Sequence, residues 1–307
     1  MTKLTRILSV SRRTDIPRFY TDWFLNRIKA GFVNWKNPFN QKVTSIYLNP
    51  DEFKILVFWT RDPQKIYKNL DFLCTSGYFP FFHVTLTGFG LPLETYPVQK
   101  DQVIRSINCL SEKLSPQRVI WRYDPIIVSE HFNENWHLQN FEKIARELSG
   151  SVKMCYFSFV DCYSKTIRNL SKNGIKTIEP GCTMKKVLSH SLAEIAEKYG
   201  ITMFSCCEND LESERIKRGH CIDAPFLNDL LNLSKTCSQD QEIPKISGNF
   251  QIDSKPAPTR EGCGCWRSVD IGSYNTCAGG CLYCYATSNH LAADKYFLEH
   301  DSMRDSL

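Results

Sequence analysis

Short apolar runs recur along the first two hundred residues, at the spacing of an α/β protein with a parallel sheet. Six runs rich in Val, Ile, Phe or Tyr predict β-strands at residues 6–10, 54–59, 81–86, 118–122, 152–160 and 201–205. Apolar residues at helical spacing predict helices at residues 19–30, 63–76, 98–114, 135–149 and 183–199. Glycine follows four of these helical stretches, as a left-handed helix end requires: Gly31, Gly77, Gly150 and Gly200.

This alternation predicts a parallel β-sheet, because parallel neighbours need a long crossover between them, usually a helix. Two architectures satisfy the pattern. One is a TIM-like (β/α) barrel of about six β/α units, partial or closed, and the other is an open doubly wound sheet. Similar polar residues recur after several strands, as they would around one barrel mouth. The barrel is therefore the prediction that we favour.

The alternating pattern fades after residue 223. Residues 234–261 are polar and contain three prolines, which predicts a long connection. A cysteine-rich stretch follows at 262–287, and a final helix is predicted at about 288–300. We therefore predict a barrel over residues 1–233. Residues 234–307 then form a linker and a cysteine-rich, metal-binding tail, packed on the barrel mouth.

Composition places the chain among ordinary globular proteins. Its 307 residues are 42% hydrophobic and 23% charged, enough to bury a full core. The net charge of +5 suits an anionic ligand but is too mild to indicate nucleic acid by itself. No apolar run approaches the roughly 20 residues of a membrane span, and the first residues do not resemble a secretory signal. We therefore expect a cytoplasmic protein without a membrane partner.

Fourteen cysteines are many for a reducing compartment, and eight of them, leaving Cys237 aside, fall in two groups between positions 206 and 284. The last three, Cys277, Cys281 and Cys284, have the spacing C-x3-C-x2-C. Gly279 and Gly280 let the intervening backbone turn its amides toward a cluster. Structural zinc sites commonly use paired cysteines, whereas three cysteines on one loop leave one iron of a four-iron cluster without a protein ligand. This spacing predicts a 4Fe-4S cluster.

The loop resembles that of radical S-adenosylmethionine (SAM) enzymes, which reads C-x3-C-x-aromatic-C. Tyr283 stands at the aromatic position, and the ending Tyr-Cys-Tyr-Ala is similar to that of spore photoproduct lyases. The resemblance implies SAM at the open iron, with Tyr283, Gly279 and Gly280 beside the cofactor. Two features depart from it. The loop lies near the C-terminus instead of after the first strand, and the chain has no Gly-Gly-Glu segment for the methionine amino group. SAM binding is therefore left open at this point.

A second group of cysteines precedes the loop, namely Cys206, Cys207, Cys221, Cys263 and Cys265. Adjacent cysteines seldom bind the same metal, so either Cys206 or Cys207 would contribute one ligand. With Cys221, Cys263 and Cys265 this makes four ligands. Four thiolates suit a second cluster or a structural zinc. Alternatively, one of the five is the fourth ligand of the first cluster, or all five are plain thiols.

Charged residues recur where the predicted strands end. They are Arg13 and Asp15, Arg61 and Asp62, Arg122 and Asp124, and Asp161. A buried charge is costly unless it is paired, so these side chains either pair with one another or face a wet cavity. In parallel barrels that cavity is the active site, where arginine suits carboxylate or phosphate. We treat these seven residues as catalytic candidates.

Over nearly its whole length the chain resembles domain-of-unknown-function family 1848. The shared motifs are Ser-Val-Ser-Arg-Arg-Thr-Asp-Ile-Pro, Phe-Trp-Thr-Arg-Asp-Pro, Trp-Arg-Tyr-Asp-Pro, Ser-Phe-Val-Asp, Cys-Cys-Glu, Cys-Gly-Cys and the C-terminal cysteine loop. The resemblance implies that these motifs belong together in one protein. It does not imply an activity, because the family has no established one.

The residues favour a radical-SAM-like redox enzyme, an oxidoreductase or lyase. It would act on a small molecule or nucleotide-like substrate and take electrons from a donor such as flavodoxin or ferredoxin. A non-catalytic binding or redox-sensing protein with structural four-cysteine iron-sulfur or zinc sites is the alternative. Nucleic-acid repair is a third hypothesis, resting only on the likeness to photoproduct lyases.

Overall fold

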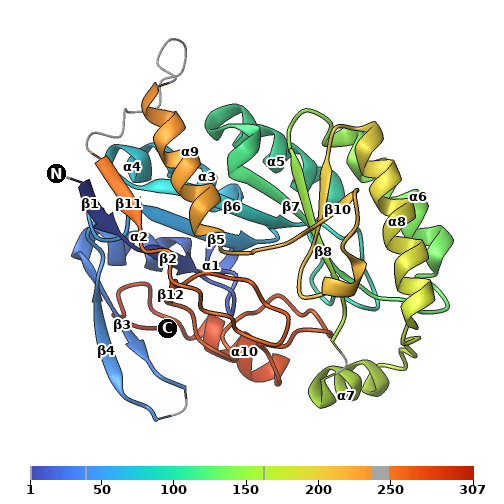
Figure 1. Ribbon diagram of the computed structural model, residues 1–307. Coiled ribbons are helices and arrows are strands. Elements are labelled where there is room, and N and C mark those ends of the chain that lie inside the picture. Colours follow the sequence, from blue (N-terminus) through green and yellow to red (C-terminus); the bar gives the residue numbers. More distant parts are fainter. Residues whose placement is uncertain (1, 39, 162, 237–248) are drawn as a thin grey trace.

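A parallel β-sheet of eight strands forms the centre of the computed structural model, which describes residues 2–38, 40–161, 163–236 and 249–307 (Figure 1). In spatial order the strands are β10 (Ile216–Arg218), β9 (Thr202–Ser205), β8 (Met154–Phe159), β7 (Val119–Ile126), β6 (Phe79–Thr85), β5 (Ile55–Thr60), β2 (Ile7–Val10) and β12 (Val269–Asp270). The six strands predicted from the sequence are all in this sheet. Cys162, Cys237 and the middle of the predicted connection, residues 237–248, lie outside the described residues.

From β2 to β10 the main-sheet strands lie side by side in chain order, and every neighbouring pair is parallel. Their carboxyl ends therefore share one edge of the sheet. The outermost strands, β10 and β12, are not hydrogen-bonded to each other in the part of the chain that is described. The parallel α/β prediction is confirmed, whereas closure into a barrel is not.

Ten helices accompany the sheet in the described residues. They are α1 (Ile16–Phe19), α2 (Thr21–Ala30), α3 (Gln64–Tyr67), α4 (Leu70–Thr75), α5 (Lys100–Leu114), α6 (Glu134–Glu147), α7 (Ser164–Lys172), α8 (Cys182–Lys198), α9 (Ala224–Thr236) and α10 (His290–Leu298). The helix predicted at 63–76 is divided into α3 and α4. Its interruption coincides with Asn69, whose side chain donates to the carbonyl of Lys65. Helices α7 and α9 were not predicted. None of the described helices is long and apolar enough to cross a membrane.

Two small sheets flank the large one. Strands β1 (Thr2–Thr5) and β11 (Asn249–Ile252) pair in parallel, and β3 (Phe32–Lys36) forms an antiparallel hairpin with β4 (Val43–Tyr47). The C-terminal segment thus does more than cover the sheet, because it contributes β11 to one sheet and β12 to another. In the main sheet Val269 is paired with Leu8, and Asp270 with Ser9. A division into two units near residue 233 stays a prediction.

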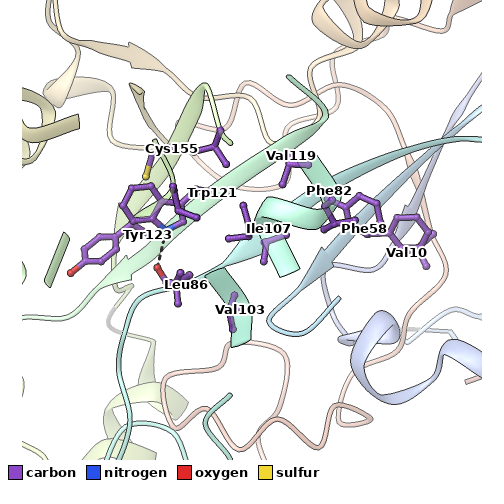
Figure 2. Packing of buried hydrophobic residues seen from close by; sticks show 14 of the residues in the cluster. Val10, Phe58, Phe82, Leu86, Val103, Ile107, Val119, Trp121, Tyr123 and Cys155 are labelled. Carbon is purple, nitrogen blue, oxygen red and sulfur yellow. Dashed lines mark hydrogen bonds between the residues drawn. The ribbon is translucent and has the colours of Figure 1, made fainter. Parts of the chain in front are cut away.

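Successive strand residues bury side chains on opposite faces of the sheet, as the pleat requires. Along β5, Leu56 and Phe58 belong to the larger core, which includes side chains of α2, α5, α6 and α8. Ile55 and Val57 belong to a second core, which includes side chains of α9 and β11. Figure 2 shows part of the larger core, where Trp121 donates its indole N–H to the carbonyl of Leu86 at 2.9 Å. Both faces are therefore covered, which explains the continuous apolar runs of the strands.

A buried polar network joins this core to α6. The Nδ1 atom of His137 lies 2.9 Å from the hydroxyl of Tyr123, and its Nε2 atom lies 3.0 Å from the carbonyl of Ile127. Because a carbonyl only accepts, Nε2 carries the proton of the neutral ring. Burial lowers the pKa of His137 to about 4. The native state therefore holds this histidine neutral where an unfolded chain would protonate it.

We expect this histidine to make the protein acid-sensitive between pH 6.5 and 4. In that range the unfolded chain binds a proton that the folded chain does not, so stability falls as the pH falls. From pH 7 to pH 5, the wild type should lose about 2 kcal/mol more free energy of unfolding than His137→Gln. Urea titrations at both pH values measure this, with the exposed His131→Gln as control. Equal pH dependence of the wild type and His137→Gln would contradict the assignment.

Candidate functional site

A cavity of about 660 Å³ lies where the parallel strands end. It is lined by residues at or after the carboxyl ends of β2, β5, β6, β7, β8 and β9, together with residues of the C-terminal segment. Its volume is in the usual range for small-molecule sites. Most of the predicted site residues line it, namely Arg13, Asp15, Arg61, Arg122, Asp124, Asp161, Cys206, Cys207, Cys221, Cys263, Cys265, Cys277, Gly279, Cys281, Tyr283 and Cys284.

Two predicted site residues, Asp62 and Gly280, are not part of this lining. The carboxylate of Asp62 accepts from the backbone N–H of Gln64 at 3.1 Å and from Nε2 of Gln102 at 3.1 Å. It therefore joins the start of α3 to α5. These contacts are structural, and the catalytic role expected from the Arg-Asp-Pro pattern stays a prediction.

Carboxylates in the cavity wall are held by neighbouring donors. Asp124 pairs with Arg122, and Asp161 pairs with Arg260, whose importance the sequence did not indicate. Asp15 accepts from the backbone N–H groups of Arg61 at 2.8 Å and Arg18 at 3.1 Å. Burial nevertheless raises the pKa of Asp15 above its ordinary value. The charged residues at these strand ends therefore do both things that were expected as alternatives: they form ion pairs, and they line a cavity.

The C-terminal loop brings its sulfurs to this cavity. A Cβ atom on Gly279 would lie 3.4 Å from Sγ of Cys277 and 3.9 Å from Sγ of Cys281, so both sulfurs flank the same glycine. Sγ of Cys284 accepts from the backbone N–H of Ala286 at 3.3 Å. Burial raises the pKa of Cys281 to about 12 and also raises the pKa of Cys277. Both thiols are therefore protonated at neutral pH in the structure as described.

Backbone contacts fix the loop against the segment after β6. Gly280 accepts through its carbonyl from the N–H of Thr95, and Leu282 donates to the carbonyl of Leu93, both at 3.0 Å. Gly280 has a φ of +67°, and a Cβ atom there would lie only 2.8 Å from Cβ of Thr95. Glycine is therefore required at position 280 for the close approach, not for direct contact with the cavity.

Glu94 is a residue of the site that the sequence did not indicate. It is 3% exposed, and its Oε1 atom lies 2.8 Å from Nη1 of Arg61 and 2.6 Å from the hydroxyl of Tyr283. Burial lowers the pKa of Arg61, but Glu94 together with Tyr283, Cys281 and Asp15 more than offsets this and raises it. Arg61 also donates to the hydroxyl of Tyr283. The aromatic residue of the cysteine loop is thus held by a buried ion pair.

The other five cysteines form a ring of thiols in mutual contact, taken in the order Cys206, Cys207, Cys263, Cys265 and Cys221. The sulfurs of Cys206 and Cys221 lie 3.2 Å apart. Two arginines touch the ring, because Arg122 donates to Sγ of Cys221 and Arg260 donates to Sγ of Cys207, each at 3.1 Å. The sequence predicted the grouping, and the structure brings all five side chains together.

Charge is distributed unevenly over the ring. Hydrogen bonds from Cys206 and Cys265 lower the pKa of Cys221 well below its ordinary value, and the nearby Arg122 adds to this. Hydrogen bonds from Cys207 and Cys265 likewise lower the pKa of Cys263. Cys221 and Cys263 therefore carry thiolate character, the form of cysteine that binds metals.

No group of three or more His, Cys, Asp or Glu side chains among the described residues is arranged to hold a metal ion. For comparison, sulfurs bound to one tetrahedral zinc at about 2.3 Å lie roughly 3.8 Å apart. The 3.2 Å between Cys206 and Cys221 is shorter than that. A metal at the ring would therefore require these thiols to separate.

We expect Glu94→Gln to destabilise the protein by about 3 kcal/mol, because Arg61 would then be a buried charge without a counter-ion. The matched control is Asp71→Asn, which removes the exposed partner of Lys113 from an ion pair of 2.7 Å. It should cost less than about 1 kcal/mol. Urea unfolding of both variants gives the comparison, and equal losses would contradict a structural role for the buried pair.

Comparisons with known proteins give a family and no relative of known activity. No curated protein matches the chain, and no solved structure matches it. One family model, described as a domain of unknown function (DUF1848), matches residues 7–286. The matched region contains both cysteine groups and all the arginines of the cavity. The chain therefore belongs to the DUF1848 family.

Proposed function

We propose that this protein is an iron-sulfur redox enzyme that acts on a small molecule in the cavity at the strand ends. One observation carries the proposal. The C-x3-C-x2-C loop and the ring of five cysteines, which comes from three separate segments, open into one cavity that six arginines also line. Buried structural metal sites have no need of a shared cavity of about 660 Å³.

The loop has the donor set for a cluster bound by three cysteines. Its sulfurs flank Gly279, and Cys284 accepts a backbone N–H, a kind of contact that tunes cluster potentials. The largest charge effects on Cys277 and Cys281 come from one another, Cys284, Asp15, Glu94, Arg61 and Arg18. A cluster held by the three loop cysteines alone keeps an open iron.

A four-iron cluster, when bound, would supply single electrons to this cavity. The chain's own residues would position the substrate. Arg122 and Asp124 face the cavity from β7, while Arg61 and Tyr283 support the loop. Such an enzyme requires an electron donor such as flavodoxin or ferredoxin. A four-iron cluster held by Cys277, Cys281 and Cys284 would keep one iron free to bind SAM as a cosubstrate. A nucleotide-like molecule is one candidate substrate.

The ring of five cysteines would hold a second cluster. Its two thiolate-like members and two arginine contacts suit an anionic metal group. The alternative function is a binding or redox-sensing protein in which both groups hold structural metals, zinc included. In that alternative the arginine-lined cavity binds a small anion or nucleic acid, and no reaction follows.

Iron content tests the first part of the proposal. After anaerobic purification and reconstitution, the wild type should contain at least about four iron and four sulfide per chain. The triple variant Cys277→Ser, Cys281→Ser, Cys284→Ser should lose about four of each. Cys109→Ser, a change in α5 far along the chain from both groups, should lose none. Zinc without iron in the wild type, or full iron in the triple variant, would overturn the proposal.

The response of the cluster to SAM tests the second part of the proposal, that SAM binds the open iron. The reduced wild type should give a cluster EPR signal whose shape changes on adding SAM, because the open iron would gain a ligand. A variant that lacks the ring cysteines Cys221 and Cys265 should keep this response, and the triple loop variant should lose it. A wild-type spectrum that ignores SAM removes radical SAM chemistry and leaves a redox enzyme of another class.

A further inference from the structure

Of the six arginines that line the cavity, five have partners in the described residues. Arg61, Arg122 and Arg260 pair with carboxylates, Arg13 lies 3.6 Å from Asp270, and Arg18 donates to the carbonyl of Tyr96 at 2.9 Å. The guanidinium group of Arg12 makes no hydrogen bond or ion pair with any described residue. It is the free cation of this cavity, as far as the structure describes it.

The main chain holds Arg12 firmly in place. Its backbone N–H donates to Asp270 at 2.9 Å, and its carbonyl accepts from the hydroxyl of Tyr285 at 2.6 Å. Its guanidinium carbon lies 5.7 Å from the centre of the Trp59 ring, a cation–π contact that orients the planar group. An arginine fixed in this way is ready to bind before its ligand arrives.

Burial lowers the pKa of Arg12, and the nearby negative groups, Asp270 first and then Cys265, Tyr285 and Cys221, raise it. A competing explanation therefore makes Arg12 a counter-ion of Asp270 or of the thiolates. That role is already filled by other residues. Arg122 and Arg260 donate directly to ring sulfurs at 3.1 Å, whereas Arg12 donates to none in the described structure. Carboxylates of the cavity do not need it either, since Asp124, Asp161 and Asp270 are held by other donors.

We propose that Arg12 binds an anionic group of the substrate, a carboxylate or a phosphate, between the cysteine ring and Tyr285. The identification of the ligand as substrate rests on the proposed function, whereas anion binding by Arg12 does not. A planar guanidinium offers paired donors that match two oxygens of either group. The motif Ser-Val-Ser-Arg-Arg therefore supplies two unlike arginines, since Arg13 serves the protein and Arg12 serves the ligand.

The test measures anion binding directly with inorganic phosphate and acetate as probes. The melting temperature of the full-length protein is followed against each anion, with chloride at equal ionic strength as reference. The wild type should be stabilised in a saturable way by at least one of the two. Arg12→Met should weaken the apparent affinity at least tenfold, and Arg12→Lys should weaken it less. The control Arg146→Met makes the same change of charge on the exposed face of α6 and should bind as the wild type does.

Further measurements separate this inference from the proposed function. The titration is repeated with the triple loop variant, in which the loop cannot hold a cluster. Anion binding that persists there and still requires Arg12 supports the inference even if iron is never found. Arg12→Met with wild-type affinity, or no saturable binding of either anion to the wild type, overturns it. Loss of iron in Arg12→Met and in Arg12→Lys, with anion affinity unchanged, also overturns it and makes Arg12 a counter-ion of the metal site.

Discussion

The pairing of the short strand β12 with β2 is the constraint on which the rest of the site depends. It joins residues about 260 positions apart, and Asp270 secures it by accepting from Ser9 at 2.5 Å, from Ser11 at 2.6 Å and from the backbone of Arg12. A carboxylate with several donors is stabilised in a partly buried place that would otherwise disfavour it. Cys277, the first cysteine of the loop, follows Asp270 by only seven residues. The pairing of β12 with β2 therefore places Cys277 near the carboxyl end of β2.

Around that anchor, the structure satisfies its buried charges by pairing them across elements. Arg61 of the β5 end meets Glu94 of the segment after β6, and Arg260 of the C-terminal segment meets Asp161 of the β8 end. Arg61 and Glu94 are largely buried, so separating them would be costly. The more exposed pair of Arg260 and Asp161 ties the tail to the β8 end more weakly. Among the described residues that line the cavity, Arg12 is the arginine whose guanidinium group has no hydrogen bond or ion pair, which makes it informative.

The strands and most helices could be predicted because local patterns determine them. Runs such as Lys54–Trp59 alternate between two buried faces, and positive φ at Gly31 and Gly200 ends helices as expected. Glu94 could not be predicted, since a single acidic residue in a loop gives no sign of the arginine that it meets. Arg12 and Arg13 are adjacent and identical in type, so only the position of Asp270 distinguishes them. The contacts of Asp62 with Gln64 and Gln102 could not be predicted either, because a structural aspartate and a catalytic one follow a strand in the same way.

The position of the cysteine loop in space removes part of the difficulty raised by its position in sequence. Radical SAM enzymes carry the loop directly after their first strand, and here it stands near the C-terminus. Yet β12 lies beside β2, Thr14 contacts Thr276 at 2.7 Å, and Tyr285 donates to the carbonyl of Arg12. The loop therefore lies at the carboxyl end of β2, the first strand of the main sheet in chain order. A loop delivered there by a C-terminal edge strand can meet a ligand at the same edge of a parallel sheet, so sequence order alone is a weak argument against the redox proposal.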